Sequence, residues 1–320
     1  MACTNPVKCW QVGVTENGKP NYVFKEPDNP WQYETQKVAC QKCVSCKLQK
    51  SAEWASRCVH EAMFHDLNSF ITLTYAPEYL PENESLDKED LRLFIKRLRR
   101  KFKNIKFKYL SCGEYGHNPN DGKIERPHYH LVLMGIDFPD KKYFFTNKIG
   151  QPVYRSDTLE KLWTKGHSSV GEFTYETAAY TARYTLKKQI NKNDIQHVNI
   201  DPETGEILEP EQYEKMMAKL GKTPEFINMS KGIGKVWLDK YDSDTDKDYI
   251  ITNYKKHKVP RYYDKKREEK DPEKIAKIKE TRQQKAKELE YDNTKVRRNS
   301  KNIIAQQCTT RLPRSYDNGN

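Results

Sequence analysis

The chain contains no long hydrophobic run, no leader that resembles an export signal and no motif for nucleotide hydrolysis. Its longest apolar stretch, around residues 131–136, is far too short to span a bilayer, so we expect no membrane partner. The first residues, MACTNPVKC, lack the basic and apolar regions of a signal peptide, which predicts a cytoplasmic protein. Gly232 and Gly234 are not part of a Gly-Lys-Ser/Thr sequence, so they do not form a P-loop.

What the chain does contain is charge, and the charge is placed unevenly. The 320 residues, 36% hydrophobic and 32% charged, have the composition of a polar, soluble protein with one large domain or two. Of the net charge of +12, most lies in residues 255–320, which hold 20 Lys+Arg against 10 Asp+Glu. Such a basic tail favours a polyanion through counterion release, without sequence preference. A solvated helix that only keeps the protein in solution is the alternative.

The eight cysteines are expected to be metal ligands or free thiols, because a reducing cytosol disfavours disulfides. Cys40, Cys43 and Cys46 follow a Cys-x-x-Cys-x-x-Cys spacing, which indicates a thiolate metal site. The candidates for a fourth ligand are Cys58, Cys9 and Cys3. A four-cysteine Zn²⁺ site that orders the N-terminal region is the leading interpretation, with an iron–sulfur cluster and unliganded thiols as alternatives. The role is structural or DNA-docking in each case.

Two histidines flank one bulky residue in a run that predicts a buried strand, residues 126–135. Because successive strand residues point to opposite faces, His128 and His130 project side by side while Tyr129 faces the other way. Paired imidazoles at this spacing are half of a site for a divalent metal. The alternative is a strand that carries two surface histidines by chance.

Residues 174–190 predict an amphipathic helix. Its apolar stripe is formed by Tyr175, Ala179, Ala182, Leu186 and Ile190. Tyr180, Tyr184 and Lys187 lie together on a different face, so core packing does not explain the tyrosines. Each tyrosine has a cation three residues later, Arg183 or Lys187, which a phenol needs nearby if it is to attack a phosphate at neutral pH. Amphipathic surface aromatics are the bland alternative.

Taken together, these motifs resemble a known family. The runs 70–75 (FITLTY), 126–130 (RPHYH) and 180–187 (YTARYTLK) resemble the three ordered motifs of HUH endonucleases that initiate rolling-circle replication. The chain is most similar to the replication initiators of gokushoviruses, single-stranded DNA phages of the microvirus group. Flanking likeness is carried by residues 112–116, Trp163, 229–234 and 260–264, and the resemblance spans roughly residues 35–264.

The resemblance implies a metal-assisted DNA-nicking and joining enzyme that forms a 5′-phosphotyrosyl link. The expected metal ligands for Mg²⁺ or Mn²⁺ are His128, His130 and Glu114, which a hairpin would bring beside the imidazoles; His117 is the competing ligand. Tyr184 is expected to make the first cut and Tyr180 the second, with Lys187 stabilising phosphate charge. DNA contacts are assigned to Arg126, Arg183 and Lys188. The expected partners are single-stranded or origin DNA, a host helicase and a host polymerase, in the bacterial cytoplasm.

Strands and helices alternate irregularly with hairpin signals, which predicts an α+β fold with a central antiparallel sheet flanked by helices. We expect an irregular Cys-rich segment at 1–60, the endonuclease domain at 61–264 with a charged insertion at 191–225, and a basic helical or disordered tail at 265–320. The predicted elements are helices at 54–67, after Asp87 and at 156–163, and strands at 69–75, 105–112, 126–135 and 168–173.

Two rival functions remain open. The nearer one is another HUH class, a plasmid relaxase or a single-strand transposase, which shares the chemistry but leaves the flanking motifs unexplained. The more distant one is a non-enzymatic, zinc-stabilised nucleic-acid-binding protein whose histidines and tyrosines only pack. Chelator-sensitive nicking separates the enzymes from the pure binder.

Overall fold

The computed structural model describes residues 3–16, 20–117, 124–187 and 210–310, which divide into two compact units. The first unit combines the described residues up to Gln49 with those from Lys285 onward. The second unit holds residues 50–284. The two ends of the chain therefore belong to one unit, although they are far apart in sequence. The expected domain boundaries at residues 60 and 264 stay predictions.

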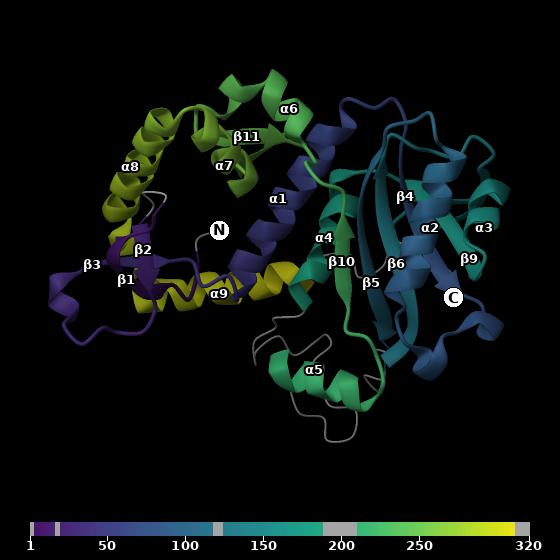
Figure 1. Cartoon of the computed structure of the whole chain (residues 1–320), viewed down its shortest axis with the longest axis horizontal. Helices are drawn as coiled ribbons and strands as arrows, with labels where there is room; N and C mark the ends of the chain where they lie inside the picture. The colour runs from purple at the N-terminus through teal and green to yellow at the C-terminus, as the bar shows by residue number, and fades with distance from the viewer. Residues whose placement is uncertain (1–2, 17–19, 118–123, 188–209, 311–320) are drawn as a thin grey trace. The chain divides into compact units, whose positions relative to one another are not determined.

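The second unit is built on a seven-stranded sheet in the order β10-β5-β6-β4-β9-β8-β7, with every neighbouring pair antiparallel (Figure 1). Its strands are β4 (Asn68–Tyr75), β5 (Lys108–His117), β6 (Ile124–Met134), β7 (Lys142–Thr146), β8 (Pro152–Arg155), β9 (Gly166–Glu172) and β10 (Phe226–Met229). The predicted α+β class with a central antiparallel sheet is confirmed. The strand that carries the histidines, β6, lies between β5 and β4.

Helices cover both faces of this sheet. The helices of the chain are α1 (Val44–Ala62), α2 (Lys88–Lys101), α3 (Asp157–Leu162), α4 (Tyr175–Lys187), α5 (Pro210–Lys219), α6 (Lys235–Lys240), α7 (Arg261–Lys270), α8 (Pro272–Glu288) and α9 (Lys295–Thr310). In Figure 1, α2 and α4 lie on opposite sides of the sheet. None of the helices in the described ranges is long and apolar enough to cross a membrane.

Alternation along the strands divides the core into two layers. Leu73, Tyr129 and Leu131 point to one face, where they pack with the apolar residues of α2 and α3. Phe70 and Val132 point to the other face, where they pack with α4 and the second half of α1. Because His128 and His130 alternate with Tyr129 and Leu131, they belong to the face that α4 covers.

Several predicted elements are confirmed with shifted ends, and others were missed. Helix α2 begins after Asp87, whose side chain accepts a hydrogen bond from the backbone N–H of Glu89. The irregular lead-in expected over residues 1–60 is wrong. That stretch forms a three-stranded sheet, β2-β1-β3, and α1 begins ten residues before the predicted start. The missed strands are β1 (Val7–Val14), β2 (Pro20–Val23), β3 (Glu34–Val38), β7, β8, β10, β11 (Tyr249–Thr252) and β12 (Lys255–Lys258).

The motifs at 229–234 and 260–264 form a buried polar junction on α1 and not a phosphate loop. The backbone N–H of Gly234 donates to the Glu61 carboxylate at 2.6 Å, and Lys108 donates to both Glu61 and the Gly232 carbonyl. Gly234 has φ +78, and an added Cβ would lie 2.3 Å from the Tyr263 hydroxyl oxygen. Only glycine fits this approach. The resemblance at these motifs therefore reflects how the fold is assembled.

His60 lies at the centre of the same junction, stacked on the Trp237 ring with centroids 3.7 Å apart. One imidazole nitrogen is 3.0 Å from the Tyr263 hydroxyl and the other is 3.4 Å from the Thr252 hydroxyl. Burial, with a smaller contribution from the charge of His257, lowers the pKa of His60 to about 3. The side chain is therefore neutral in the folded protein at neutral pH.

Acidification is therefore expected to destabilise the second unit. Between pH 6.5, the ordinary pKa of histidine, and about pH 3, the unfolded chain binds a proton at His60 that the folded chain does not. The free energy of unfolding should fall by about 1.4 kcal/mol for each pH unit lost in this window because of this group. Urea unfolding at pH 7, 6 and 5 measures the slope, and His60→Gln should reduce it by about one proton. An unchanged slope in the variant would contradict the assignment.

Candidate metal and nucleophile site

The pairing of β5 with β6 places a carboxylate beside the two imidazoles. Glu114 is directly opposite His128, and Cys112 is directly opposite His130, so all four side chains share one face. The His128 Nε2 atom is 3.1 Å from one Glu114 oxygen, and the His130 Nε2 atom is 3.9 Å from the other. One ligand atom from each of the three residues lies within 4.8 Å of the other two. This is the spacing that a single bound cation requires.

Oxygen atoms behind the two imidazoles orient them toward Glu114. The His128 Nδ1 atom is 3.2 Å from the Arg126 carbonyl oxygen, which can only accept a hydrogen bond, so the proton of a neutral ring is on Nδ1. The His130 Nδ1 atom is 2.9 Å from the Thr72 hydroxyl on β4. The Nε2 atoms are left to face the carboxylate. Partners behind ligand histidines of this kind fix the ring orientation and strengthen metal binding.

Thr72 is a residue of this site that the sequence reasoning missed, and it gives a direct test. Thr72→Val removes the hydroxyl behind His130 but keeps the shape of the side chain. We expect Mn²⁺ to bind roughly 10–100-fold more weakly at this site. Calorimetric titration of the full chain with Mn²⁺ measures the change, and Thr72→Ser is the matched control that retains the hydroxyl. Equal affinities for the Val and Ser variants would show that Thr72 does not support the site.

Tyr180 reaches the metal-ligand group from α4. Its hydroxyl is 3.5 Å from the His130 Nε2 atom, and its ring packs edge-on against His130 and Phe70. The prediction that Tyr180 lies apart from the packed face of its helix is wrong, because only 2% of the residue is exposed. Helix α4 contacts β5, β6 and β10 and is also bonded to α1, where the Ser51 hydroxyl donates to the Ala179 carbonyl.

The other predicted residues around the nucleophile are placed to different degrees. The Arg183 guanidinium is 5.3 Å from the Tyr180 ring centroid, one turn along the helix. Arg126 is exposed, two residues before His128 on β6. Tyr184 and Lys187 fall on α4, but their side chains lie outside the described residues, as does that of His117. Lys188 and residues 191–209 of the expected insertion also lie outside them.

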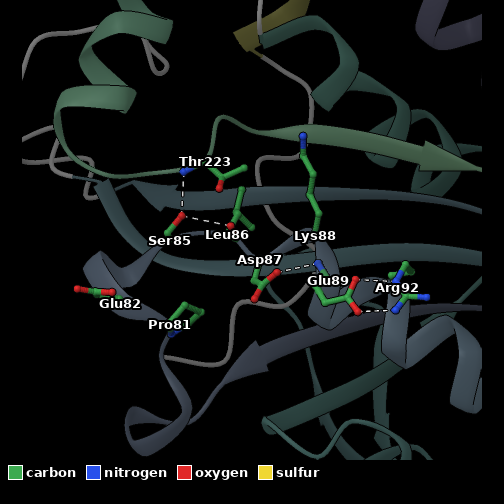
Figure 2. Close-up of a pocket in the computed structure, with 9 residues that line it drawn as sticks. All are labelled: Pro81, Glu82, Ser85, Leu86, Asp87, Lys88, Glu89, Arg92 and Thr223. Atoms are coloured by element: carbon green, nitrogen blue, oxygen red, sulfur yellow. Dashed lines mark hydrogen bonds and ion pairs between the residues drawn. The ribbon is translucent and has the colours of Figure 1, made fainter.

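A shallow groove of about 700 Å³ lies at the start of α2 and does not belong to this site. Figure 2 shows its lining, in which Asp87 caps the helix and Glu89 pairs with Arg92. The Asp87 backbone is hydrogen-bonded to the Tyr129 hydroxyl, and Tyr129 points away from the imidazoles of its neighbours. The groove is therefore on the opposite face of the sheet from the metal-ligand group.

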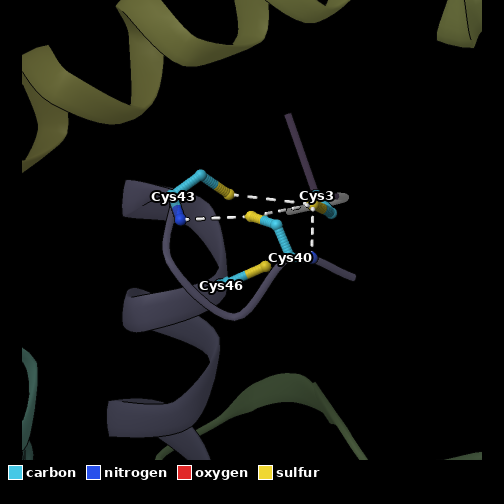
Figure 3. Close-up of side chains that lie close together, drawn as sticks. All are labelled: Cys3, Cys40, Cys43 and Cys46. Atoms are coloured by element: carbon cyan, nitrogen blue, oxygen red, sulfur yellow. Dashed lines mark hydrogen bonds between the residues drawn. The ribbon is translucent and has the colours of Figure 1, made fainter. Parts of the chain in front are cut away.

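The first unit contains a second group of metal-ligating side chains. The four cysteines are Cys3, Cys40, Cys43 and Cys46, whose sulfur atoms lie within 4.8 Å of one another and point toward a common centre in Figure 3. All four are free thiols. A hydrogen bond from the Cys46 thiol lowers the pKa of Cys43 to about 3, and the same pairing raises that of Cys46.

Cys58 is not the fourth member of this group, which corrects the sequence interpretation. It follows Cys46 by 12 residues on α1, which puts it about 18 Å along the helix axis at 1.5 Å per residue. Cys58 is fully buried among the apolar side chains of the second unit, and burial raises the pKa of its thiol to about 12. Cys3, one of the two alternatives, supplies the fourth thiol. Cys9, the other alternative, is buried in β1.

Comparison with known proteins shows what this chain is similar to. A family model for replication-associated proteins of the ORF2 type matches residues 68–189, from β4 through α4. The chain is 31% identical to Replication-associated protein VP4 of Bdellovibrio phage phiMH2K, over 96% of this chain and 85% of the relative. It is 32% identical to Replication-associated protein ORF2 of Spiroplasma virus 4, over 90% of this chain and 87% of the relative.

The chain belongs to the phage replication-associated proteins. A shorter match within this family is Replication-associated protein ORF4 of Chlamydia phage 1, 35% identical over 49% of this chain and 40% of the relative. The resemblance to gokushovirus replication initiators is confirmed by these matches. The range that the replication-associated family model covers includes Glu114, both histidines and both tyrosines. No solved structure matches the chain.

Proposed function

We propose that this replication-associated protein nicks and rejoins DNA by tyrosine attack on a phosphodiester held beside a divalent cation. The observation that carries the proposal is the position of the Tyr180 hydroxyl, 3.5 Å from the Nε2 atom of a histidine that faces a second histidine and a carboxylate. A nucleophile beside a metal-ligand group is the arrangement that phosphoryl transfer requires. Membership in a DNA-replication family supports the choice of DNA as the substrate.

The residues present fit a hard or borderline divalent cation. One carboxylate and two imidazoles leave coordination positions for water and a phosphate oxygen, which suits Mg²⁺ or Mn²⁺. When bound, the cation would polarise the scissile phosphate and offset the charge that builds up on it. Glu114 and His130 are both at most 5% exposed, so their electrostatic contribution is little screened by water. Arg183 and Arg126 supply positive charge for the phosphates on either side.

The reaction is a transesterification that balances without water. The tyrosine oxygen forms a bond to phosphorus as the bond to the 3′-oxygen breaks, which gives a 5′-phosphotyrosyl link and a free 3′-hydroxyl. The proton lost by the phenol is matched by the proton gained by the 3′-oxygen. The reverse attack by a 3′-hydroxyl rejoins the strand and frees the tyrosine. Because the phosphodiester energy is retained, no nucleotide hydrolysis is needed.

Two tyrosines on one helix allow the cycle to be repeated. Residues at i and i+4 are neighbours on a helix, so Tyr184 comes next to Tyr180 along α4. One tyrosine would hold the first link while the other cuts the regenerated site after one circuit. The order in which Tyr184 acts first stays a prediction, as does the role of Lys187. In this scheme a host polymerase extends the 3′-hydroxyl and a host helicase opens the duplex in the bacterial cytoplasm.

The test uses the full chain with the supercoiled replicative form of the genome that encodes it. We expect Mn²⁺-dependent conversion to the open circular form, and protein covalently attached to the 5′ end of the nicked strand. Excess EDTA should stop both. Salt-sensitive binding with no nicking in Mg²⁺ or Mn²⁺ would favour the non-enzymatic alternative. Transfer between unrelated DNA ends without a replication origin would favour the relaxase or transposase alternative.

A further inference from the structure

The cysteine group of the first unit is a built site that the nicking reaction does not use. Cys3 and Cys40 sulfur atoms are 3.6 Å apart, and Cys3 and Cys43 sulfur atoms are 3.8 Å apart. In a disulfide this distance would be about 2.05 Å. In a tetrahedron with metal–sulfur bonds of about 2.3 Å, neighbouring sulfur atoms are separated by about 3.8 Å. The spacing of the thiols is therefore that of a metal site and not of a disulfide.

The backbone around the group has the hydrogen bonds that thiolate ligands need. The Cys43 backbone N–H donates to the Cys40 sulfur and the Cys40 backbone N–H donates to the Cys3 sulfur, each at 3.3 Å. Gln41, between the two loop cysteines, has a left-handed φ of 61, which closes the turn. Cys43 directly precedes α1 and Cys46 is in its first turn, where the helix dipole favours negative charge.

We propose that Cys3, Cys40, Cys43 and Cys46 bind one Zn²⁺ ion as a tetrahedral four-thiolate site, separate from the nicking centre. Soft sulfur ligands exclude Mg²⁺ and Ca²⁺, and four-sulfur tetrahedral geometry selects zinc or iron. Zinc is the favoured ion because a closed four-cysteine site with no open position is typical of structural zinc. Binding it would release protons from the thiols, as metal binding to cysteine requires.

The ion would hold together a unit that has few other means of staying folded. Cys3 precedes β1 by four residues and Cys40 follows β3 by two, so the site closes the three-stranded sheet onto the start of α1. The apolar residues of this sheet that are buried are Cys9 and Trp10. A small unit of this kind commonly depends on a metal for its stability. Loss of the ion is therefore expected to unfold the first unit and leave the sheet of the second unit intact.

The test measures metal content in the full chain purified without chelator. We expect about one zinc per chain in the wild type, and at least a tenfold loss in Cys3→Ser and Cys43→Ser. The matched controls are Cys58→Ser and Cys308→Ser, which change a buried and an exposed cysteine outside the group and should keep the zinc. The His128→Ala and His130→Ala double variant should also keep it, which separates this site from the nicking centre.

A second measurement avoids variants that fail to fold. Titrating the wild-type protein with a mercurial thiol reagent should release the zinc as four thiols react, and Co²⁺ substituted for zinc should give the intense absorption of a tetrahedral four-thiolate complex. Iron in place of zinc, a wild-type chain without metal, or zinc retained in Cys3→Ser would each overturn the proposal. These readouts do not depend on nicking, so they stand or fall apart from the proposed enzyme activity.

Discussion

A chain that carries both Tyr180→Phe and Tyr184→Phe should lose covalent capture of DNA, by at least about 10³-fold, because no nucleophile remains. The Tyr180 ring packs against His130 and Phe70, and phenylalanine keeps those contacts, so the fold should be retained. The measurement is transfer of label from single-stranded oligonucleotides that tile the encoding genome to the protein on a denaturing gel. Tyr175→Phe is the matched control, since Tyr175 is on the same helix, hydrogen-bonded to His257.

Continued capture by the double variant would show that the nucleophile is elsewhere. The two single variants then divide the roles. If Tyr184 makes the first cut, Tyr184→Phe should lose initial cleavage, while Tyr180→Phe should cleave once but fail to complete the second cut. The reverse pattern would assign the first cut to Tyr180, whose hydroxyl the structure places beside His130.

The second large effect is expected from removing the metal ligands. His128→Ala with His130→Ala should reduce nicking by more than about 100-fold, since the charge on the phosphate is no longer offset. DNA binding should be largely spared, because affinity for the backbone comes from lysines and arginines that these changes leave in place. Nicking of supercoiled DNA and a binding assay at two salt concentrations, on the same preparation, measure both effects.

His65→Ala is the control for losing an imidazole from the same unit. His65 pairs with Glu61 and lies near Gly135, at the end of β6 away from His128. Its loss should leave nicking within about twofold of the wild type. A double histidine variant that nicks normally in Mn²⁺ would contradict the metal role, and one that no longer binds DNA would indicate that the histidines contact DNA directly.

The strand-based part of the site could be predicted because strand geometry is simple. Alternation with a period of two is enough to put His128 and His130 on one face. One hairpin between adjacent strands is enough to bring Glu114 opposite His128. Thr72 was missed because its contact with His130 depends on the pairing of β4 with β6, which are separated by more than fifty residues.

The helix and the cysteines show where such reasoning ends. An apolar stripe identifies one packed face of α4, but this helix is covered by the sheet and by α1, so Tyr180 is buried as well. The spacing of Cys40, Cys43 and Cys46 indicated a site, whereas Cys3 joins it only because β1 and β3 pair. Strand β1 was missed because its cysteine, glycine and glutamine interrupt the apolar pattern of a buried strand.

The nicking centre is mounted on strands that are held on both sides. Strand β6 is bonded to β5 along one edge and to β4 along the other, and the ligands and their supporting hydroxyl come from these three strands. The cradle is thus rigid before any ion arrives, unlike a knot that forms only around its metal. A cation can enter and leave without the sheet opening, so strand cleavage can be switched on and off in a test tube by supplying or withdrawing the ion.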